Sequence, residues 1–116
     1  LTDDRRSFPG VSSGTRGVFG GGYDAPSFVN VMDYITIAST GNATDFGDLT
    51  VSRARFGAMS NSTRGVFAGG DNPTYQNVMD YITIASTGDA TDFGDLITAA
   101  RTFSSGSNGH GGLVGG

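Results

Sequence analysis

Alternate positions of residues 30–41 are apolar on both sides of an extended chain. One side carries Val31, Ile35 and Ile37, and the other carries Met32, Tyr34 and Ala38. A strand with one face in water would alternate between apolar and polar residues. The pattern therefore predicts a strand that protein covers on both faces.

The same stretch returns unchanged at 77–88, and the rest of the chain follows this duplication. Thr15 recurs as Thr63, 48 residues later, and Leu49 recurs as Leu96, 47 residues later. Repeats of about 40 to 50 residues are typical of β-propeller blades. We therefore interpret the chain as a repeat array.

Each copy contains four segments that the pattern predicts as short strands. In chain order these are the segment around Phe8, Phe56 or Phe103, the run 16–20 or 64–68, the duplicated stretch, and the run 43–49 or 90–96. Gly41-Asn42 and Gly88-Asp89 predict two-residue hairpin turns before the fourth strand, because such turns require positive φ angles.

These features predict an all-β fold of four-stranded antiparallel blades of a β-propeller, with about two and a half repeats in this chain. The predicted repeats are 1–48, 49–95 and the start of a third at 96–116. A blade has two apolar faces, and propellers close with about 4 to 8 blades. The expected partners are therefore other blades of a longer chain or further copies of this one.

Composition limits the alternatives. The 116 residues include 20 glycines and no cysteine, lysine or glutamate, so exposed helix is disfavoured and disulfides and thiolate metal sites are excluded. The net charge of −4 argues against nucleic-acid binding, which needs clustered cations. No apolar run reaches the roughly 20 residues of a transmembrane helix, so membrane insertion is not expected.

Gly21-Gly22 followed by Tyr34, and Gly69-Gly70 followed by Tyr81, resemble the kelch repeat, in which an apolar strand ends in a double glycine before a tyrosine and a tryptophan. The chain departs from that pattern where the family has its tryptophan, at Phe46 and Phe93. Arg53 and Arg101 look like the kelch arginine after the fourth strand, although they occupy adjacent columns of the repeat alignment.

A closer resemblance covers nearly the whole chain. The phrases Thr-Arg-Gly-Val-Phe, Asp-Tyr-Ile-Thr-Ile-Ala-Ser-Thr-Gly and Ala-Thr-Asp-Phe-Gly-Asp-Leu occur in both copies. They are similar to the kelch-like arrays in large virion proteins of tailed phages, notably phages of marine cyanobacteria. The resemblance implies a structural or adhesive part of a virion, or otherwise an extracellular protein.

Several motifs suggest chemistry that their context does not support. Asp45-Phe46-Gly47 and its copy spell the magnesium triplet of protein kinases, but the chain has no lysine to complete that site. Gly20-Gly21-Gly22 lacks both the helix of a dinucleotide fingerprint and the Gly-Lys-Ser/Thr ending of a phosphate loop. We predict no catalytic residue and no cofactor, and an enzyme with its site in a propeller mouth is a distant alternative.

Other residues could hold ions or sugars. Asp45 with Asp48, and Asp92 with Asp95, could offer oxygens to calcium, but they lack the alternating Asp ladder, so we predict turn hydrogen bonds and no metal site. His110 is the only histidine and is predicted to lie in a solvated turn. Asn42 and Asn61 match the glycosylation sequon, which matters only in a glycosylating compartment.

The loops after the double glycines differ between the copies and are the predicted binding region. Their aromatic and polar residues could stack on a sugar or anchor a protein: Tyr23, Asp24, Phe28, Asp71, Asn72 and Tyr75. The predicted function is a non-enzymatic structural and adhesive segment that binds glycans or protein surfaces. The alternative is a purely architectural repeat that builds a fibre or tail assembly without a ligand.

Overall fold

The computed structural model describes residues 8–99, 104–107 and 112–115, and the side chains of residues 8–99. The strands of the first copy are β1 (Gly10–Ser12), β2 (Arg16–Gly20), β3 (Tyr23–Asp24), β4 (Ser27–Phe28), β5 (Val31–Thr36) and β6 (Thr44–Asp48). The strands that follow are β7 (Gly57–Ser60), β8 (Arg64–Ala68), β9 (Val78–Thr83), β10 (Thr91–Asp95), β11 (Ser104–Ser107) and β12 (Gly112–Gly115). Within the described ranges there is no helix long and apolar enough to traverse a lipid bilayer.

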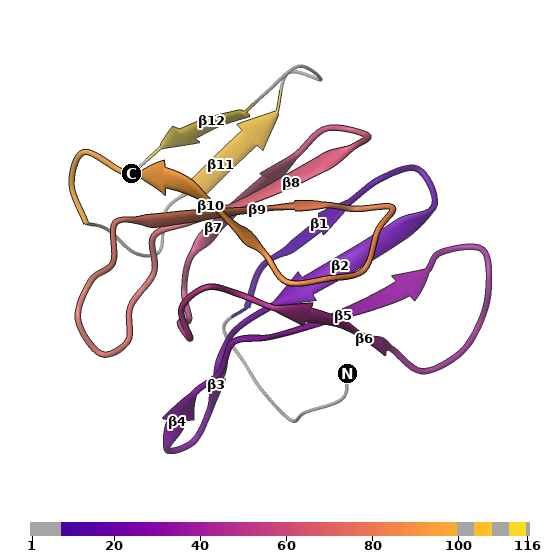
Figure 1. The fold of residues 1–116 in the computed structure, drawn as a ribbon, viewed down its shortest axis with the longest axis horizontal. Coiled ribbons are helices and arrows are strands. Elements are labelled where there is room, and N and C mark those ends of the chain that lie inside the picture. Colours follow the sequence, from indigo (N-terminus) through magenta and orange to yellow (C-terminus); the bar gives the residue numbers. More distant parts are fainter. Residues whose placement is uncertain (1–7, 100–103, 108–111, 116) are drawn as a thin grey trace.

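Each complete copy forms one four-stranded sheet (Figure 1). The strand orders are β1-β2-β5-β6 and β7-β8-β9-β10, and every neighbouring pair is antiparallel. The short hairpin β3–β4 lies between β2 and β5 in the sequence, but it forms a separate two-stranded sheet. The predicted all-β class and four-stranded antiparallel sheets are therefore confirmed.

The described strands that follow the second sheet form one hairpin. β11 and β12 pair as an antiparallel hairpin at the positions that β7 and β8 occupy in the second copy. The first strands of the three copies lie close together, with β7 beside both β1 and β11 (Figure 1). Phe103, Arg101 and His110, which the sequence singled out, lie outside the described residues.

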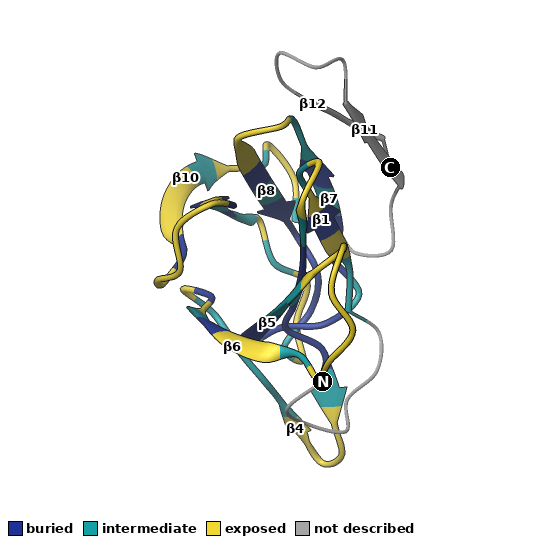
Figure 2. Cartoon of the chain, turned by 90° about the vertical axis from the view of Figure 1, so that its right-hand side faces the viewer, coloured by how far each residue is buried: buried dark blue, intermediate teal, exposed yellow. Residues whose placement is uncertain are grey.

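The two sheets pack face to face, and this contact forms the core (Figure 2). The first sheet contributes Val11, Val18, Met32, Phe46 and Leu49; the second copy contributes Phe56, Phe67, Ile82, Ile84 and Ala90. Gly20 and Gly65 allow the sheets to approach closely: Cβ atoms built there would lie 3.4 Å from the Phe67 ring and 2.6 Å from Val11 Cγ2. These close approaches let the apolar faces of the strands pack without gaps, as protein interiors do.

The predicted two-residue turns between the third and fourth strands are wrong. β5 ends at Thr36 and β6 begins at Thr44, so residues 37–43 form a longer connection, and 84–90 do the same in the second copy. The second connection contacts the neighbouring sheet. Gly88 N donates to Phe46 O at 2.7 Å, and Ala90 N donates to Asp48 O at 2.8 Å.

A β-bulge shapes the fourth strand of each sheet. The register with the third strand shifts around Phe46 in β6 and around Phe93 in β10, leaving each phenylalanine as the extra residue. A bulge breaks the ladder locally and redirects a side chain. In β6 the bulged residue's carbonyl accepts the bond from Gly88, so the bulge provides a contact between the two sheets.

Candidate functional site

The first predicted binding loop is an ordered hairpin. Tyr23 pairs with Phe28 across β3 and β4, and their ring centroids lie 5.1 Å apart. Asp24 is exposed beside them. Figure 1 shows this hairpin projecting from the ends of β2 and β5, away from both sheets. It presents a compact aromatic pair with an exposed carboxylate.

The second predicted loop is built differently, because two of its three predicted residues are bonded inward. Asp71 is 2% exposed, exchanges backbone hydrogen bonds with Ala54 and forms an ion pair with Arg55. The Asn72 side-chain amide donates to Ser52 O. Tyr75 alone is turned outward, at 54% exposure. Asp71 and Asn72 therefore anchor the loop to the chain segment 52–55.

That segment is the link between the sheets, and the double glycines make room for it. Gly21 has φ of 63°, and a Cβ built on it would lie 2.6 Å from Arg53 O. Gly70 has φ of 98°, and a Cβ there would lie 2.6 Å from Ala54 O. Any larger residue would need both a strained backbone and a displaced link. The double glycines therefore leave the space through which the link passes.

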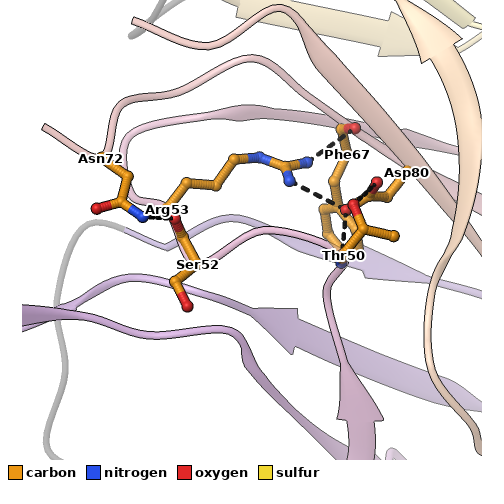
Figure 3. A network of polar contacts seen from close by, with 6 residues as sticks. All are labelled: Thr50, Ser52, Arg53, Phe67, Asn72 and Asp80. Carbon is orange, nitrogen blue, oxygen red and sulfur yellow. Dashed lines mark hydrogen bonds and ion pairs between the residues drawn. The ribbon is translucent and has the colours of Figure 1, made fainter. Parts of the chain in front are cut away.

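Arg53 joins this link to the middle of the second sheet (Figure 3). Its guanidinium lies 3.0 Å from the Asp80 carboxylate in β9, and both side chains are fully buried. It also donates to Phe67 O at 3.3 Å and lies 4.8 Å from the centre of the Phe56 ring. Thr50 donates to the same carboxylate through its backbone N–H and its hydroxyl.

Burial is costly for this cation. It lowers the pKa of Arg53 below its ordinary value, and the charge and hydrogen bond of Asp80 act in the opposite direction. The Nε of Arg53 is buried without a hydrogen-bond partner in the part of the chain that is described. The network therefore fixes the position of the link rather than offering a charge to a ligand.

The sequence pattern indicated Arg53 but not its partner. Asp80 lies in the middle of an apolar strand, as Asp33 does in the first copy, and both are fully buried. An acid at a buried strand position needs a hydrogen-bonding or charged partner. This repeated Asp within apolar strands was the signal that could have revealed the network.

Of the acidic residues considered for calcium, Asp45 and Asp48 lie in β6 beside Asp89 of the second sheet's connection, whereas Asp92 and Asp95 lie exposed in β10. Asp48 N donates to the Asp89 carboxylate at 3.0 Å. Partial burial raises the pKa of Asp48, and the nearby charges of Asp89 and Asp45 raise it further. No group of three or more metal-ligating side chains comes together among the described residues. The carboxylates of Asp89 and Asp45 therefore repel that of Asp48 at this edge.

Neither protein-family models nor curated proteins give a match to this chain. The resemblance to kelch-like phage arrays consequently stays a prediction.

Proposed function

We propose that this chain is part of a kelch-like β-propeller in which each four-stranded sheet is one blade. In this proposal it is a non-enzymatic scaffold of a virion or otherwise extracellular protein, and it displays loops for glycan or protein-surface binding. The observation that carries it is the packing of the two sheets: one face of the first sheet meets the opposite face of the second, through residues that do not correspond in the repeat alignment. Further repeats can extend such a stack in the same way.

The arrangement of the first strands supports this proposal. β1, β7 and β11 come from three successive copies, and β7 lies next to the other two. In a propeller the corresponding strands of each blade surround a common axis. The outer strands β6 and β10 carry much of the exposed surface (Figure 2). Radial growth from an axis formed by the first strands accounts for both features.

The contrast between strands and loops supports a scaffold that displays variable segments. Residues 30–41 and 77–88 are identical, whereas the loops after the double glycines differ in sequence and in structure. The hairpin β3–β4 carries the Tyr23–Phe28 pair, and the second loop exposes Tyr75. Aromatic rings with a polar edge are suited to sugar and protein surfaces.

A glycan array tests the binding role. We expect the chain to retain a defined set of glycans, and Tyr75→Ala or Tyr23→Ala to abolish that binding. Phe93→Ala is the matched control, because it removes an aromatic residue that is 49% exposed but lies outside the loops. Binding that survives both loop variants, or that Phe93→Ala abolishes equally, would contradict a loop site.

A purely architectural role is the second candidate, and the uncovered apolar residues favour it. Ile37 is 56% exposed and Phe93 is 49% exposed, although their counterparts in the other copy, Ile84 and Phe46, are buried in the core. Exposed apolar faces of this kind promote association. Filaments or rings in electron microscopy, together with no retained glycan, would support this role over adhesion.

A further inference from the structure

The inter-sheet contact contains a phenylalanine that fits into a hollow of the next sheet. Phe46, the bulged residue of β6, is 3% exposed and lies against Ile82 and the connection around Gly88. Phe46 belongs to the same buried apolar cluster as the edge-to-face pair of Phe56 and Phe67, whose ring centroids are 5.6 Å apart. We call this arrangement the filled socket.

The first sheet carries the same hollow without an occupant among the described residues, on the face that points away from the second sheet. A pocket of about 300 Å³ is lined by Phe8, Phe19, Ile35, Gly41, Asn42 and Ala43. In the repeat alignment these residues correspond to Phe56, Phe67, Ile82, Gly88, Asp89 and Ala90, so five of the six match in type. We call this pocket the open socket.

The aromatic floor of the open socket is already in place. Phe8 and Phe19 pack edge to face with centroids 6.0 Å apart and an interplanar angle of 78°, close to the 81° of the Phe56–Phe67 pair. Two residues after Ile35 in the sequence, Ile37 is 56% exposed, whereas its counterpart Ile84 is fully buried and its carbonyl accepts a hydrogen bond from Arg16 of the first sheet. The open socket therefore has the shape and chemistry of a site that is filled elsewhere in the same molecule.

We propose that the open socket binds the fourth strand of a further repeat, carrying the sequence Thr-Asp-Phe-Gly-Asp, with its phenylalanine inserted between Ile35 and residues 41–43. The inference rests on the proposed stacking of blades. The strand also needs glycine after the phenylalanine: a Cβ built on Gly47 would lie 2.1 Å from Gly88 O. This chain carries an uncovered example of such a strand, because Phe93 is half exposed and a Cβ on Gly94 would meet nothing closer than 3.8 Å.

The backbone around the open socket also matches the proposed occupant. In the filled socket the connection donates to the strand through Gly88 N and Ala90 N. Gly41 and Ala43 hold the corresponding positions on the open side. A strand with the same bulge would present its carbonyls to these two groups. The proposed contact combines apolar insertion with two backbone hydrogen bonds, as the filled socket does.

A chain with one added repeat tests the proposal. Residues 49–95 are placed directly before Leu1 of the full chain, so that the Asp95–Leu1 junction reproduces the Asp48–Leu49 link. A soluble paramagnetic probe then reports the solvent accessibility of isoleucine methyl groups by NMR. We expect the probe's effect on Ile37 to fall to that on Ile84, because the added sheet buries it. The signal of Ile84 itself should not change.

Two variants make the result specific. Phe93→Ala in the added copy alone should restore much of the accessibility of Ile37 by removing the inserted ring. Ile37→Ala should lower the melting temperature by about 5 °C or more in the extended chain, and much less in the original one. An Ile37 that remains accessible, or an added copy that stays unfolded, would overturn the proposal.

This outcome is separable from the proposed function. If the socket fills while glycan arrays and electron microscopy show neither binding nor assembly, the inference stands and the proposed function fails. If binding or assembly occurs while Ile37 remains accessible in the extended chain, the function stands and the socket is wrong.

Discussion

Residues 31–37 and 78–84 have the same sequence but different surroundings. Ile84 is fully buried and accepts a 3.0 Å hydrogen bond from Arg16 of the first sheet through its carbonyl, whereas Ile37 is 56% exposed. The fourth strands show the reverse: Phe46 is 3% exposed in the first sheet, and Phe93 is 49% exposed in the second. Each sheet buries the face that meets the other one.

This comparison shows that burial in the array is decided by the neighbour and not by the residue. A repeat contacts only the repeats beside it, so its two faces gain stability separately. The copies do agree at Asp33 and Asp80, which are both fully buried. Substitutions made in equivalent pairs therefore separate what a sheet needs by itself from what it gains by stacking.

The largest loss of stability is expected at Asp80, where the link enters the second sheet. Asp80→Ala would leave the charge of Arg53 buried without its partner, and should lower the free energy of unfolding by about 3 to 5 kcal/mol. Urea unfolding measures this loss. The double variant Arg53→Met with Asp80→Leu should recover most of it, because no buried charge remains. A double variant as unstable as Asp80→Ala would contradict this account.

The phenylalanine pair gives the next effect and the most direct test of the comparison. Phe46→Ala should lower the free energy of unfolding by about 3 kcal/mol, since it empties the filled socket. Phe93→Ala removes a half-exposed ring whose packing is the edge-to-face contact with Tyr81, and should cost under about 1.5 kcal/mol. Equal losses in urea unfolding would mean that the inter-sheet contact adds little.

Much of the sheet architecture followed from the sequence. Alternation in residues 30–41 predicted the third strand, and the duplication carried that assignment to the second copy, although the strands end earlier, at Thr36 and Thr83. The connection at 84–90 could not be predicted, because it bonds to the neighbouring sheet, a tertiary contact that local turn propensities do not encode. The identical sequences of residues 31–37 and 78–84 also could not reveal that Ile37 and Ile84 would differ in burial.

The candidate site was predicted less well than the sheets. The hairpin that carries Tyr23 and Phe28 does project, but Asp71 and Asn72 bond to the link. Such inward bonding depends on where residues 52–55 pass, which is a tertiary feature. The Arg53–Asp80 pair was missed for the same reason, since the two residues come from different elements.

A smaller effect is expected where the sheets approach most closely through glycine. Gly65→Ala would place a Cβ 2.6 Å from Val11 Cγ2, and the required shift should cost about 1 to 3 kcal/mol. Gly17 is its counterpart on the open face, where the nearest atom to a new Cβ is Ile35 Cγ1 at an ordinary 3.6 Å. Gly17→Ala should therefore be nearly neutral in thermal unfolding. A Gly17→Ala variant as unstable as Gly65→Ala would contradict the assignment of the open face.

The smallest effect concerns the acidic edge and depends on pH. The pKa of Asp48 is raised in the fold by partial burial, Asp89 and Asp45, so its proton stabilises the native state below the ordinary Asp pKa of 3.8. That contribution is lost as the pH rises through the raised pKa, which leaves repulsion at pH 7. Asp48→Asn should therefore raise the urea midpoint at pH 7, and the gain should shrink as the pH falls below 3.8.

Asp95→Asn is the control, because no counterpart of Asp89 faces it among the described residues. A gain for Asp48→Asn that is the same at pH 3 and pH 7, or that Asp95→Asn reproduces, would exclude repulsion across the inter-sheet edge as its cause.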